Sequence, residues 1–286
     1  MKQMLLLSAL LLTCGCNPTP DIKFMEYDAG YASKPDFARV EYELPIAPAD
    51  LGQLEPDMLK NYTQEQVDQI YARLTAGPIP DGAYDGDLFF PKGVSGQRRI
   101  REIVGGLPGL AAGAKTVKLE LLGKHLWRGK VFYRDERVLR NRIDDTSVLK
   151  PIMESDTSGL RKYKAGGRDQ WLLFPARLYC GQSLLDSRRE SVIIDYAYTD
   201  QIEGYVEKPD FLAGRRGLNV RDEIRMVRPG FYLGRAYIDK VFLLNFTLYN
   251  EEVAEHDGPA FVESGAVAED CWAGTQARRR QVVAAS

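Results

Sequence analysis

The stretch VRDEIRMVRPGFYLGRAYIDKVFLLNFTLYN, residues 220–250, decides the expected fold of this chain. It consists of three β-prone runs at 220–228, 231–239 and 241–250, and the turn residues Pro229-Gly230 join the first two tightly. Strands joined this closely pair in sequence order, which predicts an antiparallel meander rather than alternating βαβ units.

The same pattern extends toward the N-terminus. Further β-prone runs occupy 82–90, 171–180 and 188–198, and another spans 129–143 with a charged middle that should break it. An open sheet of about seven strands would expose two edges, and closure removes both. The sequence therefore predicts a mainly β fold, an antiparallel up-and-down barrel.

Helical patterns precede and interrupt the strands. Thr63 is the expected N-cap of a short helix, with Gln66 as its capping-box partner, and Gly77-Pro78 should stop it. A second helix is expected at 115–127, within an insertion at about 95–127 that follows the first strand. The expected organisation is a tether and irregular arm at 17–60, one barrel domain at 61–272 and a polar tail at 273–286.

The order of these elements resembles a known class of barrels. A helix, the glycine-containing first strand Gly82-Ala83-Tyr84-Asp85-Gly86 and successive hairpins are similar to the lipocalin or calycin class over roughly 82–250. The segments 126–130, 220–225 and 229–234 also resemble uncharacterised bacterial barrel proteins. The resemblance implies a lipocalin-like barrel whose lumen accommodates one small ligand.

The first sixteen residues have the pattern of an export signal. Lys2 supplies a positive start, residues 4–12 are almost wholly apolar, and Thr13-Cys14-Gly15-Cys16 follows. This resembles a bacterial lipoprotein signal, which implies lipidation of Cys16 and anchoring in the cell envelope. Asn17 after that cysteine implies the outer membrane, with the protein facing the periplasm. An ordinary secretory signal and lipidation of Cys14 are the alternatives.

Export would leave two cysteines able to pair. After removal of the signal and acylation of Cys16, only Cys180 and Cys271 remain, in an oxidising compartment. We expect a disulfide between them, with two free buried thiols as the alternative.

Composition excludes several classes of function. The chain has 38 Lys and Arg against 40 Asp and Glu, and a net charge of −2 provides no broad positive field for nucleic acid. The chain has only two histidines, so a metal site with several ligands would have to use mostly carboxylates. No nucleic-acid partner, metal or cofactor is therefore expected.

Two Arg-x-Tyr elements are candidates for holding a carboxylate by charge-assisted hydrogen bonds. Arg235 and Tyr237 share one strand face with Phe231 and Leu233, and the spacing resembles an element of fatty-acid-binding proteins. Either face of this strand could line the lumen, and solvent exposure of the pair is the alternative. The second element, at 177–179, is expected outside the barrel, because alternate residues of its strand form an apolar face without it.

Asp222 is the candidate for a catalytic acid or base. It shares a strand face with the apolar Val220, Ile224 and Met226, where a carboxylate must be paired, hydrogen-bonded or protonated. Two interpretations stay open: a structural Asp–Arg pair across a hairpin, and a general acid or base in a dry cavity.

The expected function is that of a membrane-anchored, lipocalin-like protein that binds a lipophilic small molecule, such as a fatty-acid-like carboxylate. Arg235 and Tyr237 would hold the head group, and the aromatic residues expected along the cavity are Trp127, Tyr196 and Tyr232. The alternatives are a lipid-modifying isomerase or hydrolase using Asp222, and a structural envelope lipoprotein without a ligand.

Overall fold

The computed structural model describes residues 19–27, 34–93, 127–144 and 159–275. The expected signal segment with Cys16 lies outside the described residues. So do the expected insertion, apart from Trp127, and the polar tail beyond residue 275.

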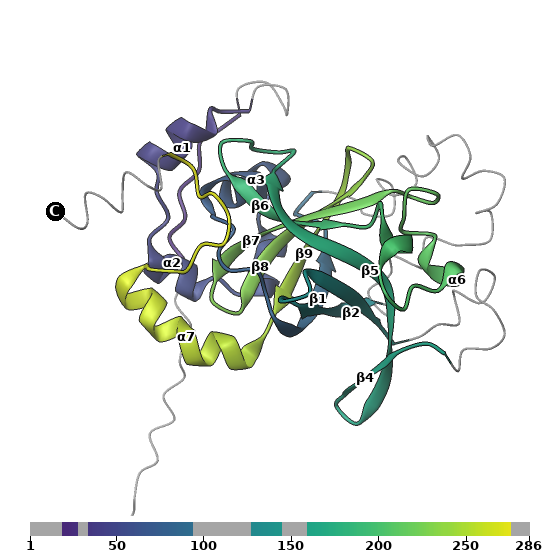
Figure 1. The fold of residues 1–286 in the computed structure, drawn as a ribbon. Helices are drawn as coiled ribbons and strands as arrows, with labels where there is room; N and C mark the ends of the chain where they lie inside the picture. Colours follow the sequence, from purple (N-terminus) through teal and green to yellow (C-terminus); the bar gives the residue numbers. More distant parts are fainter. Residues whose placement is uncertain (1–18, 28–33, 94–126, 145–158, 276–286) are drawn as a thin grey trace, which may run out of the picture.

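Eight antiparallel strands close into a barrel, which confirms the predicted fold (Figure 1). Each strand pairs with its neighbour in the ring, and the pairings of β1 with β9 and of β3 with β5 complete it. The strands are β1 (Gly82–Phe89), β2 (Trp127–Tyr133), β3 (Val138–Ile143), β5 (Arg168–Gln182), β6 (Glu190–Asp195), β7 (Val220–Arg228), β8 (Phe231–Ile238) and β9 (Val241–Tyr249). A short extra strand, β4 (Lys162–Ala165), pairs with the start of β5.

The predicted run at 129–143 is two strands. Charged residues at 134–137 form the turn between β2 and β3, because Asp and Glu are depleted in strands and Asp favours turns. Trp127, expected at the end of a helix, is instead the first residue of β2.

Short helices gather at one side of the barrel (Figure 1). They are α1 (Phe37–Glu43), α2 (Pro48–Gln53), η2 (Pro56–Asn61), α3 (Gln64–Arg73) and α7 (Glu251–Ser264), while η5 (Thr199–Gln201) and α6 (Glu207–Asp210) lie between β6 and β7. Helix α3 begins with the predicted Thr63–Gln66 capping box. The expected irregular arm instead contains α1, α2 and η2, since Asp36 caps α1 and prolines start the other two.

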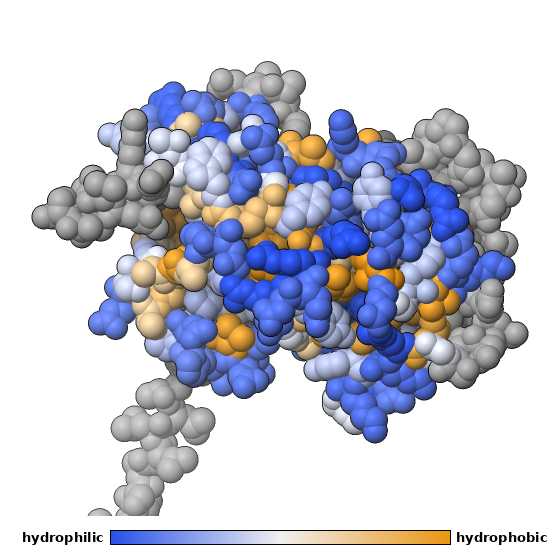
Figure 2. All heavy atoms as spheres, in the orientation of Figure 1, coloured by the Kyte–Doolittle hydropathy of each residue, from blue (hydrophilic) through white to orange (hydrophobic). Residues whose placement is uncertain are grey.

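Strand alternation separates a lumenal face from a wall face. Lumenal side chains such as Tyr84, Phe132 and Phe246 form one buried core, and wall residues such as Phe231 and Leu233 form a second core with the helices. The surface seen in Figure 2 is a mixture in which hydrophilic residues predominate, as expected of a barrel whose apolar side chains point inward.

One end of the barrel is covered by chain. Ala76 and Ile79 pack against the lumenal core, and Tyr232 donates a hydrogen bond to the carbonyl of Pro78 at 2.7 Å. The C-terminal segment reinforces this cover, since Asp270 Oδ2 accepts a hydrogen bond from the Ile79 amide at 2.8 Å. We call this the closed end.

A disulfide joins Cys180 and Cys271, as the sequence predicts, with the two Cα atoms 5.3 Å apart. The bridge fastens the C-terminal segment to the end of β5. It links residues 91 positions apart, so it removes considerable freedom from the unfolded chain.

We expect the double substitution Cys180→Ser and Cys271→Ser to lower the free energy of unfolding by about 4 kcal/mol, because the unfolded chain regains its loop entropy. Urea denaturation of the wild type and the double variant without reductant measures this loss. Wild-type protein denatured in the presence of reductant is the matched control. Identical midpoints for the oxidised wild type and the double variant would contradict the expectation.

Candidate functional site

Four polar side chains meet inside the barrel, and we call them the lumenal cluster: Lys130, Asn141, Tyr196 and Asp222. The Lys130 ammonium donates to Asn141 Oδ1 at 2.8 Å, to the Tyr196 hydroxyl at 2.7 Å and to Asp222 Oδ2 at 3.0 Å. Lys130 is on β2 and Asp222 is on β7, on the opposite side of the barrel, so this ion pair spans the lumen.

Aromatic rings surround the ammonium group. The Nζ atom of Lys130 lies 5.3 Å from the centroid of Trp127, and 5.4 Å from those of Tyr196 and Phe246. These distances are within the range of cation–π attraction. A Cβ atom on Gly234 would lie 2.2 Å from the Phe246 ring, so only glycine there leaves room for this arrangement.

Burial controls the protonation of the cluster. It lowers the pKa of Lys130, against the opposing attraction of Asp222, and it raises the pKa of Tyr196 well above its ordinary value. Tyr196 therefore keeps its proton at neutral pH, and the Asp222 carboxylate stabilises the charged form of Lys130.

The hydrogen bonds of the cluster leave one acceptor unused. All three ammonium protons of Lys130 have partners, and Asn141 Nδ2 donates to the Phe174 carbonyl and the Tyr196 hydroxyl, each at 3.0 Å. Asp222 accepts through Oδ2 from Lys130 and Tyr196. Within the described residues, its Oδ1 atom accepts no side-chain hydrogen bond. This oxygen can accept a hydrogen bond from a donor group of a bound guest molecule.

A kink in β5 positions one side of the cluster. Phe174 has a φ of 52°, and the strand pairing shifts register there. Its amide donates to Asp210 Oδ1 at 2.7 Å and its carbonyl accepts from Asn141, so both peptide groups are held. Burial raises the pKa of Asp210 to about 6.

The structure brings together three residues singled out from the sequence. Trp127, Tyr196 and Asp222 all belong to the lumenal cluster or contact it: Trp127 Nε1 donates to Asn141 Oδ1 at 2.9 Å. Tyr232 also faces the lumen but lies at the closed end.

The structure corrects the predicted position of Arg235 and Tyr237. The sequence places them at a ligand head group inside the barrel, whereas Arg235 lies on the wall, ion-paired with Asp68 of α3 and 3.0 Å from the Tyr237 hydroxyl. Helix α3 covers this wall, so its polar and apolar residues are as buried as those of the lumen. By contrast, Arg177 and Tyr179 are exposed, as predicted.

Lys130 and Asn141 of the lumenal cluster were not predicted from the sequence. The partner of Asp222 is Lys130 across the lumen, and not an arginine across a hairpin. Strand alternation carried a signal, because Lys130 shares the lumenal face with Phe132.

Comparisons with known proteins assign no family. No family model and no curated protein matches the chain. Among solved structures, the chain is similar to the crystal structure of a protein from Thermomonospora curvata, at 17% identity and a TM-score of 0.34. The match covers 71% of this chain and 99% of that one. Similarity at this level assigns no function.

Helices of membrane-spanning length and hydropathy are absent from the described residues.

We expect Lys130→Met to lower the free energy of unfolding by about 3–5 kcal/mol, because it leaves the Asp222 carboxylate buried without a cation. The double substitution Lys130→Met and Asp222→Leu should recover most of this loss, since it replaces the pair by apolar groups of similar volume. Urea denaturation at pH 7 measures both variants. Equal stability of the single and double variants would be evidence against the pair.

The raised pKa of Asp210 predicts a pH dependence. Between pH 4 and 6 the folded state keeps a proton that the unfolded state has lost, so the free energy of unfolding falls as pH rises through this window. The fall is about 3 kcal/mol, from roughly two pKa units. Asp210→Asn should flatten this part of the profile. Urea denaturation at half-unit pH steps tests it, and parallel profiles for the two proteins would exclude Asp210 as the source.

Proposed function

We propose that this protein is a lipid-anchored, lipocalin-like barrel that binds a lipophilic small molecule carrying a hydrogen-bond donor. The observation that supports the proposal is the unused acceptor Oδ1 of Asp222, within a cluster whose other groups are satisfied. A hydroxyl or amide N–H of the guest would donate to this oxygen. Hydrogen bonds are stronger in such a largely buried surrounding than in water, because the local dielectric constant is low.

The charge balance of the lumenal cluster favours an uncharged head group. The single positive charge of Lys130 is matched by Asp222, and its three donors are used. A carboxylate guest would have to displace Asp222 from Lys130. The expectation of a fatty-acid-like carboxylate depended on Arg235, whose guanidinium is paired with Asp68 on the wall. An alcohol or an amide with a long apolar body fits better.

The apolar body of the guest would lie at the end opposite the closed end. Phe90, Trp127 and Phe174 are half-buried there and pack against the lumenal core. Large aromatic surfaces that stay partly exposed are typical of sites that bind apolar molecules. The guest would therefore bind with its donor toward Asp222 and its apolar part against these rings.

The anchor belongs to the same proposal. Lipidation of Cys16 would hold the barrel at the bacterial outer membrane, facing the periplasm, close to a supply of lipophilic molecules. Acyl chains contribute about 0.8 kcal/mol per buried methylene, so several chains together make a stable anchor.

A structural envelope lipoprotein without a ligand is the competing function. Side chains from opposite sides of the barrel meet within the lumen, as those of Lys130 and Asp222 do. Such contacts indicate a core filled by the protein's own side chains. A lipid-modifying enzyme that uses Asp222 as acid or base would share the guest-binding site and would add turnover.

Native mass spectrometry of the full chain, extracted from its own envelope, tests the proposal. We expect the wild type to retain a guest, and Lys130→Met with Asp222→Leu to lose at least nine-tenths of it, because the polar cluster is gone. The matched control is Arg235→Met with Asp68→Leu, which removes a buried pair of the same type from the wall. This control should retain the guest.

A bare wild-type chain would contradict binding and support the structural function. Loss of the guest in the wall variant alone would show that the head group is held at Arg235. Circular dichroism of each variant verifies that the barrel is folded.

A further inference from the structure

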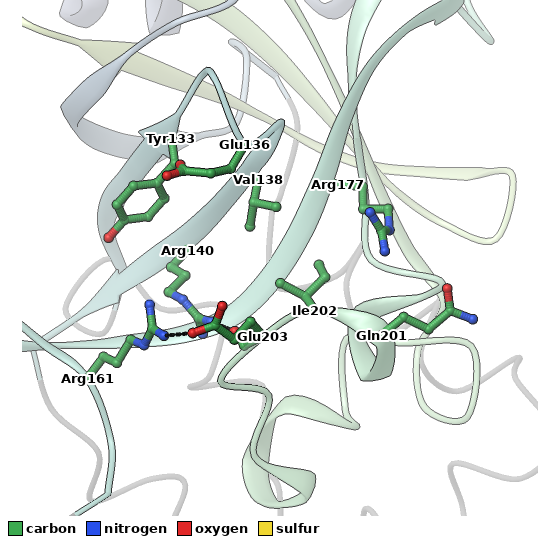
Figure 3. Close-up of a pocket in the computed structure, with 9 residues that line it drawn as sticks. All are labelled: Tyr133, Glu136, Val138, Arg140, Arg161, Arg177, Gln201, Ile202 and Glu203. Carbon is green, nitrogen blue, oxygen red and sulfur yellow. Dashed lines mark hydrogen bonds and ion pairs between the residues drawn. The ribbon is translucent and has the colours of Figure 1, made fainter.

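A pocket lies on the outer wall of the barrel, away from the lumenal cluster. It has a volume of about 270 Å³ and is formed by β3, β5 and the loop after η5 (Figure 3). Arg140, Arg161 and Arg177 line it, together with the acidic Glu136 and Glu203. The remaining lining residues are Tyr133, Val138, Gln201 and Ile202.

Arg140 at this pocket is a buried cation without a carboxylate partner among the described residues. Arg140 is only 2% exposed, and its guanidinium donates hydrogen bonds to the main-chain carbonyls of Glu203 and Gly204. Carbonyl groups satisfy hydrogen bonds but do not neutralise a charge. Burial and the nearby charge of Arg161 lower the pKa of Arg140, against the opposing attraction of Asp210 and Glu203.

The backbone at Gly204 keeps two guanidinium groups close together. Its φ is +73°, and a Cβ atom there would lie 3.0 Å from Arg161 Nε and 3.1 Å from Arg140 Nη2. Glycine therefore lets two like charges approach the same stretch of main chain. Like charges this close repel each other, and an anion between them would relieve the repulsion.

The acidic residues of the pocket compensate these charges only in part. Glu203 pairs with Arg161 at 3.1 Å, but its side chain is 94% exposed, and exposed pairs are weak. Figure 3 shows Glu136 on the far side of the pocket, next to Tyr133. A bound anion would avoid this side.

Arg177 completes the arrangement from the opposite wall of the pocket. It is exposed, and within the described part of the chain no ion pair or side-chain hydrogen bond holds its guanidinium. Figure 3 places it across the pocket from Arg140 and Arg161. Guanidinium groups present forked donors that match phosphate and carboxylate oxygens.

We propose that this pocket binds a small soluble oxyanion, a phosphate or a carboxylate group, between Arg177 and the pair formed by Arg140 and Arg161. The site lies outside the barrel and does not depend on a lumenal guest. Its volume accommodates a small organic anion.

Isothermal titration calorimetry of the full chain tests the site, with inorganic phosphate and citrate as probes at constant ionic strength. We expect saturable binding of at least one probe and none of chloride. Arg177→Ala should weaken that binding at least tenfold, because it removes a forked donor. The affinity of Arg177→Lys should fall between those of the wild type and Arg177→Ala, since lysine keeps the charge but lacks the forked donors.

Arg216→Ala is the matched control, because Arg216 is an exposed arginine outside the pocket, paired with Glu207. It should bind as the wild type does. Stronger binding of phosphate or of citrate identifies the preferred group, and either supports the site. Absence of saturable binding for both probes, or equal weakening by Arg177→Ala and Arg216→Ala, would overturn the proposal.

Discussion

Pairing of β3 with β5 is the constraint on which the rest of the structure depends. It runs from Val138 opposite Arg177 to Ile143 opposite Trp171, and it converts a long sheet into a ring. Once the ring is closed, alternate side chains of every strand are separated into a lumen and a wall. A polar side chain on the lumenal face is largely removed from bulk water, so burial favours a partner inside the barrel. The ion pair of Lys130 and Asp222 follows from this condition.

Buried charges serve different ends on the two faces. On the wall, the pairs Asp68–Arg235 and Glu41–Arg189 join helices α3 and α1 to strands or loops more than 140 positions away. Since the desolvation of such pairs offsets much of their attraction, they fix the position of the helices more than they stabilise the chain. In the lumen, the pair joins two opposite strands that the sheet already fixes. Its effect is instead to place a cation and an anion within the lumenal core.

The strands could be predicted from the sequence because their signals are local. Turn residues such as Pro229-Gly230 separate β-prone runs, and closure was predicted because it removes the two exposed edges of the sheet. The lumenal face could not be assigned in the same way. All eight residues of β8 are buried, because α3 covers its wall side, so alternation of polarity is lost there. Arg235 was assigned to the lumen for this reason. Lys130 was missed because a lysine in a strand ordinarily indicates a solvent-facing position.

Strand β3 shows how one element carries two kinds of chemistry. Arg140 points to the wall pocket and Asn141 to the lumenal cluster, although the two residues are adjacent. The pleat separates a pocket lined by three arginines and two glutamates from a lumenal cluster with one cation and one anion. A charged ligand gains attraction only where the charge is uncompensated, and an uncharged donor gains most where water is excluded. Thus the wall pocket suits the proposed oxyanion and the lumenal cluster suits the proposed neutral guest.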